Sequence, residues 1–263
     1  MHQIVRYSRI WWKFTTNSFM VSLAGRFNAG VFLVGKLLRF IFFFTFLLTI
    51  FSHTDSLGGY SAVQIAFFYF SYNFIDTLSQ LLYREVYQFR PLIVSGDFDF
   101  VLVKPMNALF RSLFGSADPL DFFMLFPYTV ILIYAAGLLG PLAAWDVIVY
   151  ILLMISGFMI ITGFHIVVLA LGIIATEVDH AIMMFRDILS MGRIPVDIYR
   201  EPLRGLLTFI LPIGIMMTMP PKALMGLLSV WMIVVSLGLS LLFFVVCLKA
   251  WRYALSQYSS ASS

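Results

Sequence analysis

Charge is the scarcest property of this sequence. Only 11% of its 263 residues are charged, whereas 61% are hydrophobic and 17% are aromatic. Soluble domains carry about 25% charged and about 45–50% apolar residues. A soluble chain of this size still exposes roughly a quarter of its unfolded-state surface, so the composition excludes a water-soluble fold. The sequence therefore predicts a protein whose solvent is lipid.

Cysteine and histidine are also scarce, which limits the available chemistry. The single Cys247 excludes a disulfide framework and a multi-cysteine metal site. The four histidines lack metal-ligand spacing, and the sequence holds neither His-Glu-x-x-His nor Gly-x-Ser-x-Gly. We interpret His165 as a packed, hydrogen-bonded residue, and the Glu177, Asp179 and His180 cluster as a solvated cap. A membrane enzyme is therefore poorly supported.

Two features that would suggest nucleotide or nucleic-acid binding do not hold. The net charge of +4 comes from basic residues between apolar runs, whereas nucleic acid requires them on one solvated face. Residues 30–37 imitate a phosphate-binding loop, but Leu37 stands where Ser or Thr would hold magnesium. We expect no nucleic-acid partner, and no ATPase, bound cofactor or metal site in this chain.

Long uncharged runs locate the membrane spans. A charged residue at the centre of a span costs ~2.5–3.5 kcal/mol, and a helix needs about 20 residues to cross the bilayer. Pro212 makes the fifth run a broken, kinked or partly re-entrant span. We predict an all-α membrane protein with one domain, residues 1–263, and six transmembrane helices near 31–52, 60–83, 119–141, 145–175, 203–220 and 224–248.

The basic residues predict the orientation of these spans. With both termini in the cytoplasm, the inner segments 1–39, 83–118, 176–204 and 249–263 hold 16 of the 17 Lys and Arg residues, and only Lys222 falls outside. Cytoplasmic loops carry such an excess of positive charge. The prediction is a multi-pass membrane protein with a cytoplasmic N-terminus and C-terminus.

The first 27 residues have a pattern of their own. Tyr7, Trp11 and Phe14 recur at helical spacing, with Arg9 and Lys13 on the opposing arc. This pattern is typical of an amphipathic helix that lies in the headgroup plane and contacts membrane lipid. A frayed basic tail is the alternative.

Asp76 is the ionisable residue that falls well inside a predicted span. Asn73 and Gln80 share its helical face. Ionisable groups at membrane depth face a bundle interior, a cavity or a partner. We predict either a polar patch that lines a substrate path or a structural hydrogen-bond cluster.

The 84–118 loop is too patterned for a plain linker. Arg84 and Glu85 continue the second span, Pro91 breaks the helix, and Gly96 and Pro105 bound a short segment that contains Asp97 and Asp99. We predict a compact cytoplasmic element that docks on something else, with Arg84, Glu85, Arg90, Pro91, Gly96, Asp97, Asp99 and Pro105 as its functional residues. A segment packed on the headgroups is the alternative.

This loop resembles the cytoplasmic signature of the bacterial type-two ABC exporter permeases. Residues 90–105 read RPLIVSGDFDFVLVKP, with the Gly, the acidic-aromatic-Asp step and the basic-Pro pair of that family. Residues 192–199, which read GRIPVDIY, the pairs at 203–204, 211–212 and 219–220, and the ending at 258–262 also match its pattern. The resemblance covers essentially the whole chain, and it implies a location in a bacterial inner membrane.

The resemblance implies a permease subunit of an ATP-driven exporter, which forms the substrate pathway as a homodimer or as a heterodimer with a related permease. Separate ABC ATPase subunits would bind ATP and Mg, and residues 84–105 would couple them to the spans. Pro195, Tyr199, Arg204 and Pro212 would form the entry and break of the fifth span. The alternative is a secondary transporter or channel without ATP, which would show paired broken helices in two halves.

Overall fold

The computed structural model describes residues 2–24, 26–176 and 178–259. Residues 1 and 25 of the predicted interfacial helix, Glu177 of the predicted cap and most of the tail at 258–262 lie outside this range. Apart from an isolated bridge between Leu57 and Tyr60, the described residues form helices, turns and loops, which confirms the all-α fold class.

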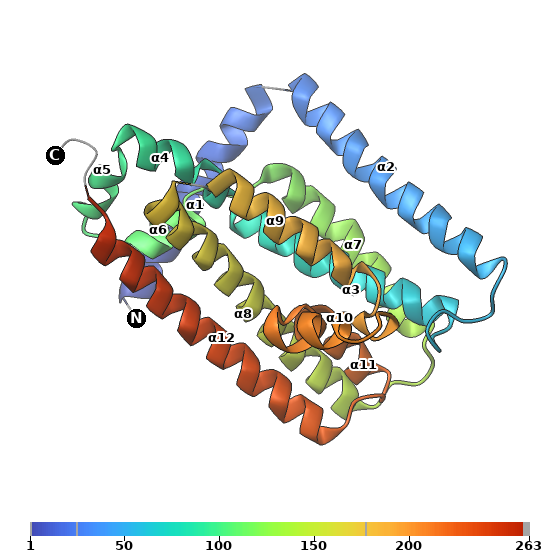
Figure 1. Ribbon diagram of the computed structural model, residues 1–263. Coiled ribbons are helices and arrows are strands. Elements are labelled where there is room, and N and C mark those ends of the chain that lie inside the picture. Colours follow the sequence, from blue (N-terminus) through green and yellow to red (C-terminus); the bar gives the residue numbers. More distant parts are fainter. Residues whose placement is uncertain (1, 25, 177, 260–263) are drawn as a thin grey trace.

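Within the described ranges, the helices follow one another without a strand between them (Figure 1). In chain order they are α1 (His2–Ala24), α2 (Arg26–Phe51), α3 (Ala62–Leu82), η1 (Arg84–Gln88), α4 (Phe89–Ser95), α5 (Phe98–Leu102), α6 (Ala108–Phe114), α7 (Pro119–Gly137), α8 (Ala144–Ala175), α9 (Val178–Ser190), η2 (Met191–Arg193), η3 (Val196–Ile198), α10 (Leu203–Gly205), η4 (Leu206–Ile210), η5 (Gly214–Thr218), α11 (Met219–Leu224) and α12 (Val230–Gln257).

Four of the described helices are long and apolar enough to cross a membrane, so the chain is a multi-pass membrane protein. They are Gly30–Phe51 within α2, α7, α8 and α12. The pair Leu203–Ile210 and Gly214–Leu224 also passes when taken together, but it bends by 81° at a short break that contains Pro212. The second predicted span corresponds to α3, which is 21 residues long but more polar.

The core of the bundle forms around α8. Glycines let its neighbours approach closely: a Cβ on Gly163 would lie 2.8 Å from the ring of Phe243 in α12, and one on Gly172 would lie 2.5 Å from Val178. His165 is buried, its Nδ1 lies 2.8 Å from the carbonyl oxygen of Ile161, and its ring packs against aromatic neighbours. This environment fits the packed role that we expected for it.

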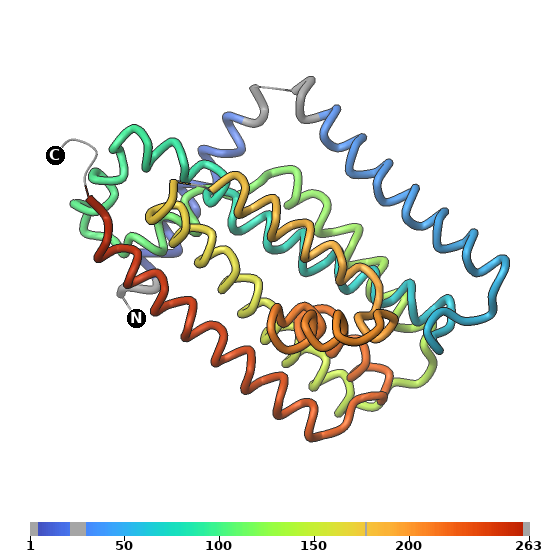
Figure 2. Tube along the Cα trace, in the orientation of Figure 1, coloured from blue at the N-terminus to red at the C-terminus, as the bar shows by residue number. Residues whose placement is uncertain are grey.

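Helix α2 stands apart from the rest of the bundle over much of its length (Figures 1 and 2). Only 6% of its apolar window is buried. Its contacts include an ion pair between Lys36 and Asp121 of α7, and a stack of Phe43 on Tyr69 of α3 with ring centroids 4.2 Å apart. Most of this helix is therefore not covered by the rest of the described chain.

The chain after α8 takes a path that we did not expect. Helix α9 runs antiparallel to α3: Asp179 contacts Arg90, Arg186 contacts Asp76, and further on Asp197 accepts a hydrogen bond of 2.7 Å from Tyr60. Tyr60 precedes α3, whereas Arg90 follows it. Residues 178–198 thus pass from one end of the bundle to the other, and our assignment of 176–204 to a single cytoplasmic segment is wrong.

The assignment of residues 176–204 failed because it counted basic residues without considering which groups in the folded chain pair with them. Arg186 is neutralised by Asp76, and the guanidinium of Arg193 lies 5.9 Å from the ring centroid of Tyr72. These two partners let arginines lie between helices in a bundle that faces lipid. We call the end that holds Tyr60 and Asp197 the far end, and the end that holds residues 84–118 the near end.

The segment from α10 to α11 begins and ends at the far end. Asp197 lies just before this segment and Lys222 close to its end, yet their charged groups are 2.8 Å apart. Thr218 also accepts a hydrogen bond of 3.0 Å from the amide of Val196. The predicted break at Pro212 is therefore confirmed, and residues 203–224 form a bent hairpin that packs on α8.

Helix α1 places the predicted aromatic face against α6. The rings of Tyr7 and Phe110 lie 4.6 Å apart, and the guanidinium of Arg111 lies 4.8 Å from the ring centroid of Phe14. Trp12, on the other side, is 63% exposed. Contact of this exposed side with the headgroups stays a prediction.

Gly157 should be intolerant of larger side chains. A Cβ there would lie 2.8 Å from the carbonyl oxygen of Met216, which belongs to the hairpin backbone and cannot rotate away. We expect Gly157→Val to destabilise the purified protein by about 1–3 kcal/mol, the usual cost of overpacking. Thermal unfolding followed by size-exclusion chromatography measures this loss.

The matched control is Gly238→Val, because nothing lies within 4 Å of a Cβ at Gly238 in α12. Equal melting temperatures for the two variants would contradict the close approach of α8 and the hairpin.

Candidate functional site

The segment between α3 and α7 folds into four short helices at the near end. These are η1, α4, α5 and α6, and we call them the near-end element. We expected Pro91 to break a helix, but it is the third residue of α4. Proline is accepted there because the first turn leaves its amide groups without helical partners.

Two buried phenylalanines attach this element to the bundle. Phe89 of α4 and Phe98 of α5 are both fully buried, with ring centroids 5.2 Å apart. Phe89 also packs near Trp251, and Phe98 packs edge-on against Tyr258. Trp251 lies in the last two turns of α12, and Tyr258 follows this helix directly. Burying a large side chain stabilises by about 1.5–3 kcal/mol, so the two rings hold α4 and α5 firmly.

Ion pairs also connect the near-end element to the rest of the bundle. Glu85 and Arg111 pair inside the element, while Arg90 reaches Asp179 of α9 at 3.2 Å. Arg84 lies 3.7 Å from Asp118, the residue that caps α7. The arginines that we predicted to face a partner protein thus have partners within the chain.

The remaining predicted residues shape the turns of the element. Gly96 ends α4 with a φ of 80°, a conformation that residues with a Cβ rarely adopt. Asp97 accepts a hydrogen bond of 2.7 Å from Ser95, and Asp99 accepts one of 3.0 Å from Tyr258. Arg6 of α1 donates to the carbonyl oxygen of Pro105 at 2.6 Å.

The outer surface of the element carries large apolar side chains. Val94, Phe100 and Val103 are 61%, 65% and 78% exposed. Val94 lies on α4, Phe100 on α5 and Val103 directly after α5, and these two helices are not among those long and apolar enough to cross a membrane. A patch of this kind next to the membrane is a candidate contact for another protein.

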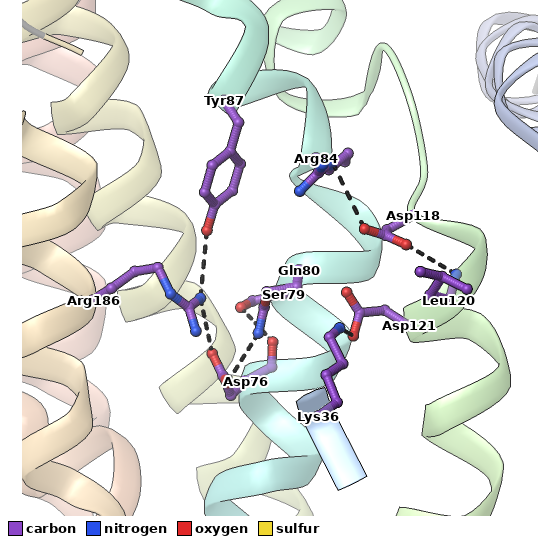
Figure 3. Close-up of polar contacts among 10 residues, drawn as sticks. All are labelled: Lys36, Asp76, Ser79, Gln80, Arg84, Tyr87, Asp118, Leu120, Asp121 and Arg186. Atoms are coloured by element: carbon purple, nitrogen blue, oxygen red, sulfur yellow. Dashed lines mark hydrogen bonds and ion pairs between the residues drawn. The ribbon is translucent and has the colours of Figure 1, made fainter. Parts of the chain in front are cut away.

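Asp76 lies at the centre of a second cluster, between α3 and α9 (Figure 3). It is 1% exposed, its Oδ1 lies 3.3 Å from Nη1 of Arg186, and its Oδ2 accepts a hydrogen bond of 3.0 Å from Gln80. Arg186 also donates to Tyr87 at 3.4 Å, and burial raises the pKa of this phenol. Tyr87 therefore stays protonated at neutral pH.

Asn73, the third residue of the predicted patch, does not join this cluster. Its side-chain amide donates to the carbonyl oxygen of Tyr69 at 2.7 Å, one turn earlier in the same helix. The structure thus brings together Asp76 and Gln80, and Arg186 of α9 packs against the side of α3 that carries them.

The pair between Lys36 and Asp121, which joins α2 to α7, was not predicted from the sequence (Figure 3). The second oxygen of Asp121, Oδ2, is buried without a hydrogen-bond partner among the described residues. The signal in the sequence that could have predicted this pair is the presence of opposite charges near the ends of two predicted spans.

The predicted entry of the fifth span lies at the far end instead. Pro195 precedes η3, and the hydroxyl of Tyr199 donates to the carbonyl oxygen of Met191 at 3.0 Å. Arg204 pairs with the exposed Glu201, and Pro212 lies at the bend of the hairpin. These four residues shape the hairpin and its approach.

Comparison with known proteins gives one result. A family model described as ABC-2 family transporter protein matches residues 37–262. The match includes the near-end element, the Asp76 cluster and the hairpin. No curated protein and no solved structure shows significant similarity to the chain.

Removing one partner of the Asp76–Arg186 pair should cost more stability than removing both. Arg186→Gln leaves a carboxylate buried without a counter-charge, which costs about 3–5 kcal/mol. In Asp76→Asn/Arg186→Gln, two neutral amides can hydrogen-bond, so we expect much of the loss to return. Thermal unfolding of the purified variants gives the comparison.

Arg204→Gln is the control, because both members of its pair with Glu201 are about half exposed and such pairs contribute about 0–1 kcal/mol. If Arg186→Gln unfolds no earlier than Arg204→Gln, the pair does not hold α9 against α3.

Proposed function

The chain belongs to the ABC-2 family of transporter membrane proteins, and we propose that it is the permease subunit of an ATP-driven exporter. The family implies ATPase partner subunits, and this chain contributes the membrane domain. We propose that two permeases, identical or related, form the substrate pathway, and that the partners bind ATP and Mg.

The observation that carries this proposal is the near-end element. Fully buried Phe89 and Phe98 fix it to Trp251 and Tyr258 at the C-terminal end of the chain, and the half-exposed Arg90 contacts Asp179 of α9, while Val94, Phe100 and Val103 remain exposed. A rigid, apolar surface outside the helices that cross the membrane can receive a push from a closing ATPase. We propose that α4 and α5 are the coupling helices.

We propose six crossings, made by α2, α3, α7, α8, residues 178–198 and α12. The 21 residues from Val178 to Ile198 would extend about 30 Å as a helix, which matches the hydrocarbon thickness. With this path, the near-end segments 1–39, 83–118 and 249–263 still hold 12 of the 17 basic residues. The positive charge thus supports a cytoplasmic near end and cytoplasmic termini.

We also propose that the Asp76–Arg186 pair closes the pathway in this conformation. Asp76 is almost fully buried, so a path past it opens only when α9 separates from α3. A push on the near-end element would reach α9 through Arg90 and Asp179.

Charged substitutions on the coupling surface should release the ATPase. We expect Phe100→Glu and Val103→Glu to lower co-purification of the ATPase subunits by about tenfold or more, as loss of central apolar contacts does. Gly96→Trp should have the same effect, because tryptophan does not fit a φ of 80°. The amounts are measured by quantitative mass spectrometry of the purified complex.

The control is Leu227→Glu, an exposed apolar residue in the far-end loop. If the ATPase is retained equally by all of these variants, α4 and α5 do not couple it. If the isolated chain transports in liposomes without ATP, it is a secondary transporter or a channel.

Cysteine labelling tests the six crossings. In a Cys247→Ala background, Ser56→Cys, Ser95→Cys and Arg200→Cys place single exposed thiols after α2, in α4 and after η3. We expect a membrane-impermeant maleimide to label residues 56 and 200 in intact cells, and residue 95 only after permeabilisation. If residue 200, like residue 95, is labelled only after permeabilisation, residues 178–198 do not cross the membrane.

A further inference from the structure

Helices α2, α3 and α7 enclose an apolar groove of about 470 Å³ in the far half of the bundle. Phe40, Phe44 and Leu48 line it from α2, Ala66 from α3 and Ile131 from α7. Its shape follows from the weak attachment of α2, which leaves a gap between this helix and its neighbours.

A second, more polar cavity of about 290 Å³ adjoins the groove at the far end. Val63 and Leu138 line both cavities, so the two lie side by side. Gln64 and Asp146 provide polar side chains in the second cavity. We call this second cavity the polar chamber. The apolar groove and the polar chamber match the two parts of an amphiphilic molecule, its apolar chain and its polar head.

The polar chamber offers one acceptor and one donor. Asp146 forms no ion pair and no side-chain hydrogen bond with any other described residue. Gln64 accepts a hydrogen bond of 2.9 Å from the amide of Ser61 through its Oε1, which leaves its Nε2 available to donate. A carboxylate beside an amide donor is complementary to a head that carries a cation next to an anionic or ester oxygen.

The depth of the groove corresponds to one leaflet. Its lining on α2 runs from Phe40 to Phe51, about 16 Å along the axis, which is half of the about 30 Å hydrocarbon layer. A helix of a second copy would cross the whole layer and needs a channel about 10–12 Å wide. A single acyl chain fits this half-depth slot better.

We propose that the groove and the chamber together bind one zwitterionic phospholipid. One acyl chain occupies the groove, the ammonium group of the head pairs with Asp146, and Gln64 donates to a phosphate or ester oxygen. The site belongs to the single chain and does not depend on transport or on an ATPase partner.

Native mass spectrometry of the full-length chain tests this site. The protein is purified in a mild detergent and incubated with equal amounts of dioleoyl phosphatidylethanolamine and dioleoyl phosphatidylglycerol. We expect one retained phosphatidylethanolamine molecule, favoured about fivefold over phosphatidylglycerol, the discrimination that a part-exposed ion pair supplies. Asp146→Asn should abolish this preference.

Filling the groove should remove the lipid itself. We expect Ala66→Phe to eliminate both adducts, whereas Val234→Phe, at a lipid-facing position of α12, leaves them unchanged. Ala62→Phe, at the exposed side of the groove, gives the same test if Ala66→Phe does not fold. Adducts that persist in the filled variants overturn the acyl site, and a preference that survives Asp146→Asn overturns the assignment of the head.

Discussion

A carboxylate that is buried between helices must keep its guanidinium partner, because a desolvated charge that remains alone costs several kcal/mol. In this protein the constraint applies to Asp76 and Arg186, which fasten α9 to α3 halfway along the bundle. The rest of the path follows from it. Once α9 lies along α3, residues 196–199 must reach the far end, and the segment from α10 to α11 has to return to that same end before α12 begins.

The same pairing connects the two ends of the molecule. At the near end, Arg90 joins α4 to the start of α9, and at the far end Asp197 joins η3 to Tyr60 and Lys222. Residues 178–198 therefore have contacts at the near end, at Arg186 and at the far end. In the proposed exporter, such an element can transmit a rigid-body displacement between packed states, from the coupling helices to the hairpin.

Helix α2 behaves differently because one ion pair and a few aromatic contacts hold it. Lys36 and Asp121 fix its near half, while its far half leaves room for the groove. A loosely attached helix next to a firmly packed bundle gives lipid access to α3 and α7. The proposed phospholipid site thus arises from uneven packing and does not require a dedicated domain.

The sequence by itself determined the all-α membrane class, the positions of α2, α7, α8 and α12, the patterned loop before α7 and the break near Pro212, because hydropathy, chain punctuation and proline act locally. It did not determine the path of residues 176–204. Arg186 and Arg193 looked like residues of a cytoplasmic loop, since the partners that shield them, Asp76 and Tyr72, are more than 100 residues away in the chain. Only the tertiary structure decided which charges meet, and therefore which segments pass through the bundle.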